Sequence, residues 1–409
     1  MKIRHHCVEN MKVDESGQGD LFALPVFELL ASLLDHDGIP SIIVIGCGRH
    51  KKKSPTRAQD LYTSERFKRS KSIALNISAP FFVLSAKHGL LEPEQIVEPY
   101  DFEISTMGVQ EKNLWAESVL MSISKLKFDA KITVLADKDY ALPLINFNIA
   151  TGGKLRIVTP FVDLLPEHIP VWLEQAERLS MRVRDLTKLY RHIDTARENG
   201  FTFKFSELSE TKLARRGVYI FLDPHEKNFL NNGPRIVRIG THAVSSESKS
   251  TLRTRLRSHF GQMDGGGNHR GSIYRLHVGR ALLESGSLSF HKETWGQGQH
   301  APSEIREDEL ELERQVSVYL SRLEVFIVPI DDEPSKYSLR ALVETQLIAL
   351  CTENFAVVDE PSHDWLGRYS PMLPIVKSGL WNLRDVAKKY NPDELGSVAH
   401  IISMQESHK

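Results

Sequence analysis

Cysteine is scarce in this sequence. Its three cysteines, at positions 7, 47 and 351, form no Cys-x-x-Cys pair. This usage fits a reducing compartment and a fold without structural disulfides.

Long apolar runs are missing as well. The best candidate, residues 21–34, is interrupted by Pro25 and Glu28, and it is shorter than the ~18 residues that a membrane span needs. Histidine, glutamate, lysine and aspartate occur within the first 19 positions, where a signal peptide would have its apolar core. We therefore expect a cytoplasmic protein without a membrane span.

The chain also lacks a net charge of either sign, since its formal charge is −1. Nucleic acids bind to local basic patches, however, and not to the net charge. One basic run alone is typical of a solvated face, but three runs beside candidate site loops favour a nucleic-acid partner. The runs are Arg49, Lys51, Lys52 and Lys53 with Arg57; Arg66 to Lys71; and Arg253, Arg255 and Arg257 with Arg270, Arg275 and Arg280.

The remaining composition is that of a globular protein, with 41% hydrophobic and 26% charged residues. A length of 409 residues suits two or three domains. Strands at residues 41–46, 81–85, 131–136 and 154–159 alternate with helices and are nearly all apolar. This pattern predicts an α/β domain with a parallel, Rossmann-like sheet covered on both faces, whose ligands bind beyond the carboxyl ends of the strands.

A different pattern begins after residue 212. Residues 216–221 and 235–240 indicate two short strands, and residues 250–260 indicate a helix. Arg255 and His259 are four positions apart on this helix, so both side chains project from one face of it.

This constellation resembles the GIY-YIG nuclease family, in which two tripeptides lie on adjacent strands and the next helix carries an Arg followed by a His or Tyr. The first tripeptide here is Gly217-Val218-Tyr219. The second is Arg238-Ile239-Gly240, in which Arg238 replaces the second tyrosine of the family. The resemblance covers residues 212–386 and implies an α+β domain, with Asn382 or Asn354 as the family's structural asparagine.

The resemblance also implies roles in phosphodiester hydrolysis. Tyr219 would hydrogen-bond or deprotonate the attacking water, and Arg255 would hold the scissile phosphate. Glu344 lies in an apolar helix at residues 339–351, where a carboxylate is costly unless it is paired or metal-bound. In the family this glutamate is the single metal ligand, so a Mg²⁺ or Mn²⁺ ion is implied. Taken alone, Glu344 fits the rim of an amphipathic helix equally well.

The missing second tyrosine leaves several alternatives open. Arg238 stays protonated near neutrality, so it cannot act as an acid or base. It would supply charge at the phosphate instead, or else His242 or Tyr274 would fill the lost position. A version of the fold that only binds nucleic acid is the remaining alternative.

Three motifs follow strands in the first half of the chain. The glycine-rich basic loop at residues 46–53 fits a tight turn as well as a small-nucleotide site. The stretch at residues 85–91 follows the second strand, and the loop at residues 136–140 follows the third. Residues 85–91 and 98–101 together resemble an uncharacterised bacterial family related to the peroxide-stress protein YaaA, and this resemblance covers residues 40–176. More distantly, they resemble the uracil-DNA glycosylase fold.

That second resemblance implies that this half recognises or excises a base. Asp101 or Asp137 would hold a water or stabilise an oxocarbenium ion. His88 and Lys87 would contact the leaving base or the phosphates, and Ser85 belongs to the same motif. Alternatively, Lys87 would form a Schiff base with an opened sugar. Ordinary turns explain the same residues without any catalysis.

We therefore predict a leader and helix at residues 1–39, an α/β domain at 40–180, a helical linker at 181–200 and a nuclease-like domain at 201–400. The predicted function is a modified-DNA restriction enzyme in phage defence. Its first module reads or excises a base flipped from the duplex, and its second cuts the backbone. A nucleic-acid-binding or stress-response protein without turnover, and a nuclease directed at RNA, are the alternatives.

Overall fold

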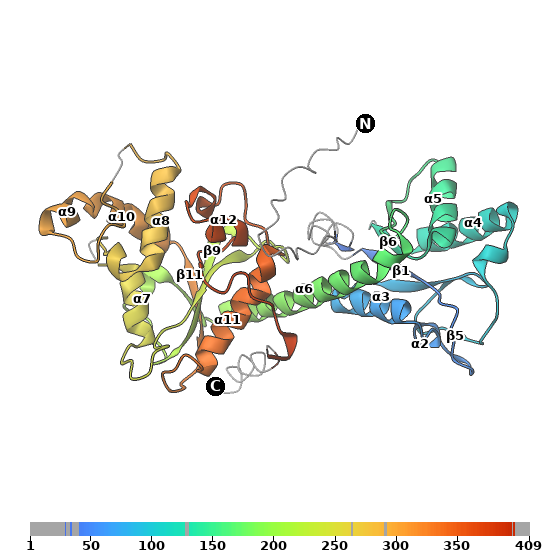
Figure 1. Cartoon of the computed structure of the whole chain (residues 1–409), viewed down its shortest axis with the longest axis horizontal. Coiled ribbons are helices and arrows are strands. Elements are labelled where there is room, and N and C mark those ends of the chain that lie inside the picture. The colour runs from blue at the N-terminus through green and yellow to red at the C-terminus, as the bar shows by residue number, and fades with distance from the viewer. Residues whose placement is uncertain are drawn as a thin grey trace. The chain divides into compact units, whose positions relative to one another are not determined.

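A computed structural model describes residues 29, 33–34, 41–126, 131–262, 265–289, 293–394 and 396. The chain divides into two compact units, unit 1 at Met1–Leu179 and unit 2 at Ser180–Lys409, and the division falls inside helix α6 (Ile169–Glu198) (Figure 1). The predicted leader and helix of residues 1–39 lie almost wholly outside the described residues. Within the described ranges, no helix is long and apolar enough to cross a membrane.

Unit 1 is built on a five-stranded sheet with the order β4-β3-β1-β6-β7. Strand β1 pairs in parallel with β3 and with β6, and β6 pairs in parallel with β7. The strands are β1 (Ile42–Gly46), β3 (Phe81–Ser85), β4 (Gly89–Leu91), β6 (Ile132–Leu135) and β7 (Ile157–Val158). A second, two-stranded sheet pairs β2 (Thr56–Arg57) with β5 (Ile96–Val97).

The expectation of a wholly parallel sheet is wrong at one edge, because β4 runs antiparallel to β3. The chain reverses within three residues after Ser85, whose hydroxyl accepts a hydrogen bond from the backbone N–H of His88 (3.0 Å). Gly89 then takes a φ of +71°, a conformation that glycine adopts without strain. Residues that looked like a loop therefore extend the sheet.

Helices cover both faces of this sheet. Helix α3 packs on β1 and buries Phe67 and Ile73, while α4 and α5 pack together over a core that contains Val44, Trp115 and Leu144. The segment between β2 and β3 forms two helices, because Ser64 caps a new start by accepting a hydrogen bond from the Phe67 N–H (3.3 Å). The helices of unit 1 are α2 (Ala58–Leu61), α3 (Glu65–Asn76), α4 (Val109–Lys125) and α5 (Lys138–Ala150), with 3₁₀ turns at Ile104–Thr106 and Pro166–His168.

Unit 2 contains an antiparallel sheet with the order β10-β9-β11-β8. The two strands and the helix expected after residue 212 are confirmed as β9, β10 and α7. The strands are β8 (Thr202–Lys204), β9 (Gly217–Lys227), β10 (Pro234–Gly240) and β11 (Glu324–Pro329). The helices are α7 (Leu252–Phe260), α8 (Ile273–Glu284), α9 (Ser303–Asp308), α10 (Leu310–Ser321), α11 (Leu339–Thr352) and α12 (Leu373–Ser378), with 3₁₀ turns at Phe205–Glu207, His269–Gly271, Glu353–Phe355 and Leu366–Tyr369.

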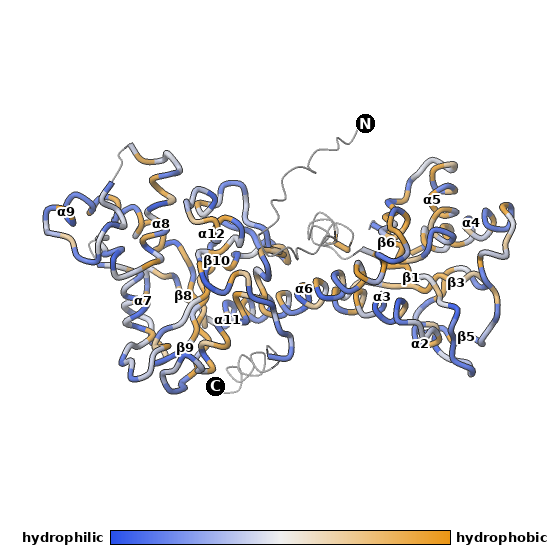
Figure 2. Tube along the Cα trace, in the orientation of Figure 1, coloured by the Kyte–Doolittle hydropathy of each residue, from blue (hydrophilic) through white to orange (hydrophobic). Residues whose placement is uncertain are grey.

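An aromatic core holds unit 2 together. Tyr219 and Phe221 of β9 pack with Tyr274 of α8 and with Trp365 and Trp381 from the last part of the chain. Figure 2 shows the hydrophobic residues concentrated in the strands and in the parts of helices near them. Burial of these large side chains is the main favourable term for folding.

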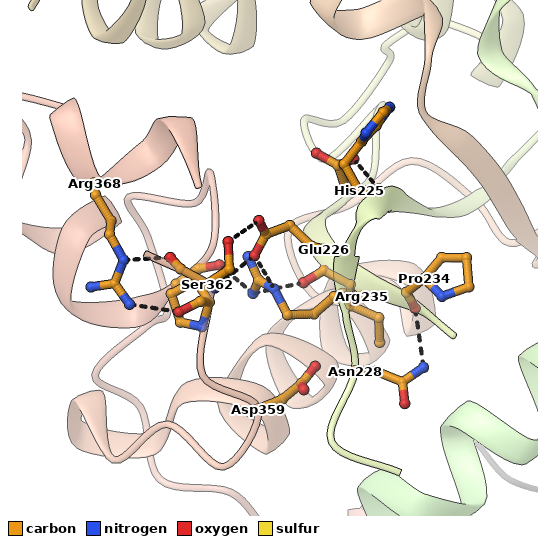
Figure 3. A network of polar contacts seen from close by, with 12 residues as sticks. His225, Glu226, Asn228, Pro234, Arg235, Asp359, Ser362 and Arg368 are labelled. Carbon is orange, nitrogen blue, oxygen red and sulfur yellow. Dashed lines mark hydrogen bonds and ion pairs between the residues drawn. The ribbon is translucent and has the colours of Figure 1, made fainter. Parts of the chain in front are cut away.

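A buried polar network fastens the last segment of the chain to the β9–β10 hairpin (Figure 3). Glu226 pairs with Arg235 (3.3 Å) and accepts hydrogen bonds from the hydroxyl (2.6 Å) and the backbone N–H (2.9 Å) of Ser362. Arg235 also donates to the carbonyl of Gly379 (2.8 Å). The network thereby brings Asn382 beside β10, where its side chain makes two hydrogen bonds with the backbone of Ile239 (2.8 and 3.2 Å).

Candidate active site

A hydrogen-bonded chain of three side chains runs through the interior of unit 2. The hydroxyl of Tyr219, on β9, lies 3.0 Å from Nε2 of His259 on α7. The other ring nitrogen of His259, Nδ1, lies 2.7 Å from the hydroxyl of Ser272, which caps α8. Burial holds the pKa of His259 well below its ordinary value, and the neighbouring charges of Arg238 and Arg255 add to this. The imidazole is therefore neutral, and one of its nitrogens is free to accept a proton.

The strand register explains why the second tripeptide ends in glycine. Gly240 lies directly opposite Tyr219 in the β9–β10 ladder. A Cβ atom at this position would lie 2.3 Å from the Tyr219 hydroxyl oxygen. Only glycine therefore leaves room for the tyrosine ring to reach His259.

Glu344, on α11, lies in the same region. Its Oε1 accepts a hydrogen bond from the backbone N–H of Thr241 (3.2 Å), which directly follows β10. Burial raises the pKa of Glu344 to about 7, against the opposing effect of Arg238 and Arg255 and with a contribution from the charge of Asp385. A carboxyl group in this state is poised between its neutral and its charged form near neutral pH.

The two arginines of the region differ in their freedom. Arg238 is 7% exposed, its guanidinium lies 4.6 Å from the centre of the Tyr274 ring, and it donates a hydrogen bond to the carbonyl of Trp381. It is therefore a fixed source of positive charge inside the fold. Arg255 is half-buried, and within the described residues its guanidinium makes no hydrogen bond or ion pair. Arg255 is thus the arginine with donors left for a ligand.

Two residues were alternatives for the missing second tyrosine. Tyr274 is fully buried, and its hydroxyl has no hydrogen-bond partner within the described ranges. His242 is 4% exposed, and neither of its ring nitrogens has a hydrogen-bond partner there. Burial lowers the pKa of His242 to about 4, and the charges of Arg340, Arg216 and Arg255 act in the same direction. His242 is therefore a neutral base close to Arg255.

Residues of unit 1 that were expected to be catalytic do not share one cleft. Ser85 is buried, and its hydroxyl bonds to that of Tyr100 (2.7 Å). His88 packs edge-on against the Tyr100 ring, with Lys87 5.6 Å from the centre of that ring. Asp137 instead pairs with Arg66 (2.6 Å) and lines a cleft to which Ser85, Lys87, His88 and Asp101 do not contribute.

Comparison with known families agrees with the geometry of unit 2. A model described as the GIY-YIG domain matches residues 180–408, which is more than half of the chain. The chain belongs to the GIY-YIG family. A second model, a family of unknown function (DUF6884), matches residues 42–167. Comparisons with curated proteins and with solved structures found no match. Membership in the GIY-YIG family supports an endonuclease activity and implies binding to DNA.

The GIY-YIG domain was expected to hold a divalent cation at Glu344. Within the described residues, no group of three or more His, Cys, Asp or Glu side chains is placed to hold a metal ion. A one-carboxylate site does fit, because the burial that raises the pKa of Glu344 to about 7 would be relieved by a bound cation. Mg²⁺ commonly binds through one or two carboxylates and keeps several waters.

Three residues near the GIY-YIG site were missed from the sequence. Ser272 carried a usable signal, because it stands at the N-cap position before the helical residues of α8. Thr241 contributes its backbone, which no side-chain pattern reveals. Asp385 acts on Glu344 through its charge, and nothing in the local sequence indicates this contact.

The basic residues expected to contact nucleic acid differ in their surroundings. The prediction for Arg275 is wrong, because Arg275 is fully buried against Glu313 (2.7 Å) and donates to the carbonyls of His259 and Phe260. Arg253 donates to the carbonyls of Leu208 (3.0 Å) and Thr211, so it is held against the fold. The exposed members of the expected set are Arg49, Lys52, Lys53 and Arg257. Arg49 pairs with Glu103 (3.1 Å). Lys51 is half-buried, and its Nζ atom lies 4.5 Å from the centre of the Tyr100 ring.

Proposed function

We propose that the GIY-YIG domain is a metal-dependent endonuclease in which Tyr219, Arg255 and Glu344 act on one phosphodiester. The observation that carries this proposal is the hydrogen-bonded chain from Tyr219 through His259 to Ser272. It supplies a proton path from a phenol to a neutral imidazole, beside an arginine with free donors and a desolvated carboxylate.

In the proposed reaction, the guanidinium of Arg255 binds the two free oxygens of the scissile phosphate. A water oxygen attacks the phosphorus, and its proton passes to the Tyr219 oxygen while the Tyr219 proton passes to Nε2 of His259. Nδ1 of His259 keeps its proton in a hydrogen bond to Ser272, which stabilises the imidazolium. The bond from phosphorus to the leaving oxygen breaks, and solvent protonates that oxygen. Glu344 would hold a Mg²⁺ or Mn²⁺ ion, which would supply positive charge near the reacting phosphate.

Arg238 stabilises the charge that develops on the phosphate without moving. Its contacts with Tyr274 and Trp381 fix its position, so it costs no reorganisation during the reaction. His242 is the second candidate for accepting the water proton. Its neutral ring beside Arg255 favours this role.

We further propose that the substrate is DNA with modified bases, that unit 1 recognises or excises the base, and that the enzyme restricts phage DNA. The support is the presence in one chain of a GIY-YIG domain and of a second domain with an open cleft that basic and acidic residues line together. Two tethered modules act on one site at a high effective concentration. Binding without cleavage, and cleavage of RNA, are the alternatives.

The test is incubation of the full chain with DNAs that carry different bases, with and without Mg²⁺, and with an RNA of the same sequence. Nicks should appear only with metal and only in wild-type protein, with Glu344→Ala as the inactive control. Nicking that depends on hydroxymethylated cytosine supports the modified-base substrate, and equal nicking of unmodified DNA removes it. Free base released without metal assigns excision to unit 1.

A further inference from the structure

Unit 1 contains an open cleft of about 410 Å³ beyond the carboxyl ends of two neighbouring strands. Its floor is formed where β1 ends at Gly46 and where β6 is followed by Ala136. The walls come from the loop after β1, the start of α3, the start of α5 and the segment at residues 102–105. A cleft of this volume suits a ligand of nucleotide size.

The cleft lies at the switch point of the sheet. The chain leaves β1 through α3 and returns in parallel at β3 on one side, whereas β6 joins β1 in parallel on the other side. Loops at the carboxyl ends of β1 and β6 therefore diverge to opposite faces of the sheet. In open parallel sheets, ligands bind in the crevice that such a divergence opens.

One side of the cleft is suited to an anion. Arg49, Lys51 and Arg66 line it, together with Ser64 at the start of the 12-residue helix α3. Arg66 is fixed by its ion pair with Asp137 (2.6 Å) and lies 4.8 Å from the centre of the Phe161 ring. Its Nη2 atom is buried and has no hydrogen-bond partner within the described residues. The Arg66 side chain is 31% exposed in all, so its accessible part can contact an anion in the cleft.

The cleft also offers an apolar surface and acceptors, although one acceptor, Glu103, pairs with Arg49 (3.1 Å). Phe102 lines the cleft and is 39% exposed, with Ile104 beside it. Glu103 and Asp139 supply carboxylate oxygens, which accept hydrogen bonds from amino and hydroxyl groups. At the inner end, the Tyr140 hydroxyl lies 3.0 Å from the Cys47 sulfur. An aromatic face for a planar ring, with polar groups at its edge, is a general arrangement for binding a base.

We propose that this cleft binds one nucleoside monophosphate unit, with its phosphate toward Arg66 and Lys51 and its base against Phe102. The unit comes either from a nucleotide turned out of a polynucleotide or from a free nucleotide. The first source deepens, and rests on, the proposed recognition of a base by unit 1. Neither source depends on cleavage by the GIY-YIG domain.

The experiment is calorimetric titration of the full chain carrying Glu344→Ala, which removes cleavage. Each of the four deoxynucleoside monophosphates, the matching nucleosides and inorganic phosphate are titrated in turn. At least one monophosphate should bind, with its nucleoside and inorganic phosphate each at least tenfold weaker. Phe102→Ala and Lys51→Ala should each weaken binding at least tenfold. The matched controls are Phe201→Ala and Lys125→Ala, which change exposed residues outside the cleft and should leave binding unchanged.

Two oligonucleotide duplexes distinguish the sources. A duplex with one unpaired nucleotide that displaces the bound monophosphate, when a fully paired duplex does not, identifies a nucleotide turned out of the duplex. Displacement by neither duplex identifies a free nucleotide, whereas equal displacement by both shows that the cleft binds a duplex without a turned-out base and overturns the proposal. The absence of monophosphate binding at millimolar concentration, or binding that survives Phe102→Ala and Lys51→Ala, overturns the proposal. If the Glu344→Ala chain binds a monophosphate but the wild-type protein cuts no nucleic acid, the proposed endonuclease activity is refuted and the proposed nucleotide cleft is not.

Discussion

The Tyr219 hydroxyl oxygen and Nε2 of His259 lie 3.0 Å apart inside unit 2. This contact joins the first tripeptide of the GIY-YIG signature to the helix that follows the second one. It places a group able to take up a proton beside the phenol that the proposed reaction uses.

Removing the phenol oxygen of Tyr219 or of the nearby Tyr274 should distinguish the roles of these two tyrosines in cleavage. Tyr219→Phe should lower kcat by about 10²–10⁴-fold, because it removes the proton path, while binding to DNA persists. Tyr274→Phe is the matched control, because this tyrosine is equally buried and its hydroxyl has no partner in the described part of the chain. Single-turnover cleavage and a DNA-binding assay measure the two effects. Loss of activity in Tyr274→Phe with normal activity in Tyr219→Phe would reverse the assignment.

Cation binding at Glu344 should depend on pH. Its pKa is raised to about 7 by burial, and a protonated carboxyl group does not bind a cation. The apparent affinity for Mn²⁺ should therefore rise about tenfold per pH unit up to pH 7 and level off above it, as measured by electron paramagnetic resonance. Glu344→Gln should abolish both the binding and its pH dependence. Glu210→Gln, at an exposed position, should change neither.

The same carboxyl group makes a prediction about stability. Between pH 4.5 and 7 the unfolded chain ionises at this position while the folded chain stays protonated, so this group lowers the free energy of unfolding as the pH rises. Glu344→Gln should thus be more stable than the wild type at pH 8 without metal and close to it at pH 4. Chemical denaturation at the two pH values checks the sign. If Glu344→Gln were less stable than the wild type at pH 8, burial of the Glu344 charge would not be destabilising, and the prediction would be wrong.

Acid should destabilise the folded chain partly through His277. Burial lowers the pKa of His277 to about 4, aided by the charges of Arg238 and Arg280. As the pH falls from 6.5 to 4, the unfolded chain binds a proton at this position that the folded chain does not, so stability is lost over this window. His277→Leu should reduce that loss by about 3 kcal/mol, whereas His300→Leu, at an exposed position, should not. Identical pH profiles for wild type and His277→Leu would refute the role of burial.

Arg275 and Arg257 should respond oppositely to substitution. Arg275→Met leaves Glu313 without its guanidinium partner in the interior, so the free energy of unfolding should fall by about 3–5 kcal/mol. Arg257→Ala, at an exposed position on α7, should change stability by less than about 0.5 kcal/mol. It should instead weaken DNA binding and reduce the slope of log K against log salt by about 0.9. Denaturation curves and DNA binding at several salt concentrations measure the two effects. If Arg275 contacted DNA, Arg275→Met would instead weaken DNA binding and leave stability unchanged.

Local patterns predicted much of the fold of unit 2. The β-branched and aromatic residues of β9 and β10, and the spacing of Arg255 and His259 on α7, depend only on neighbours in the sequence. In the structure, the charges of Arg238 and Arg255 act on the pKa of Glu344 and on that of His259, the residue that contacts Tyr219. Their chemical roles remain predictions.

Contacts between distant residues limited what the sequence revealed. Glu313 buries Arg275 from 38 positions away, so counting basic residues placed Arg275 on the surface. The edge strand β4 depends on the turn at Gly89. The sequence of this segment does not distinguish a turn that leads into a strand from a turn that leads into a loop. In unit 1, the cleft forms from four segments, and only one of them, residues 46–53, had been considered as a nucleotide site.

The register of Tyr219 opposite Gly240 has a consequence for comparing relatives of this chain. The glycine contributes no reacting atom, and its identity is dictated by the neighbouring strand's aromatic ring. A relative that has lost the tyrosine is released from this constraint and can acquire a side chain at the glycine position. Paired loss of the two residues would thus be expected in relatives that no longer need the phenol, and retention of the glycine beside an altered residue such as Arg238 reflects a tyrosine ring that is still packed against this strand.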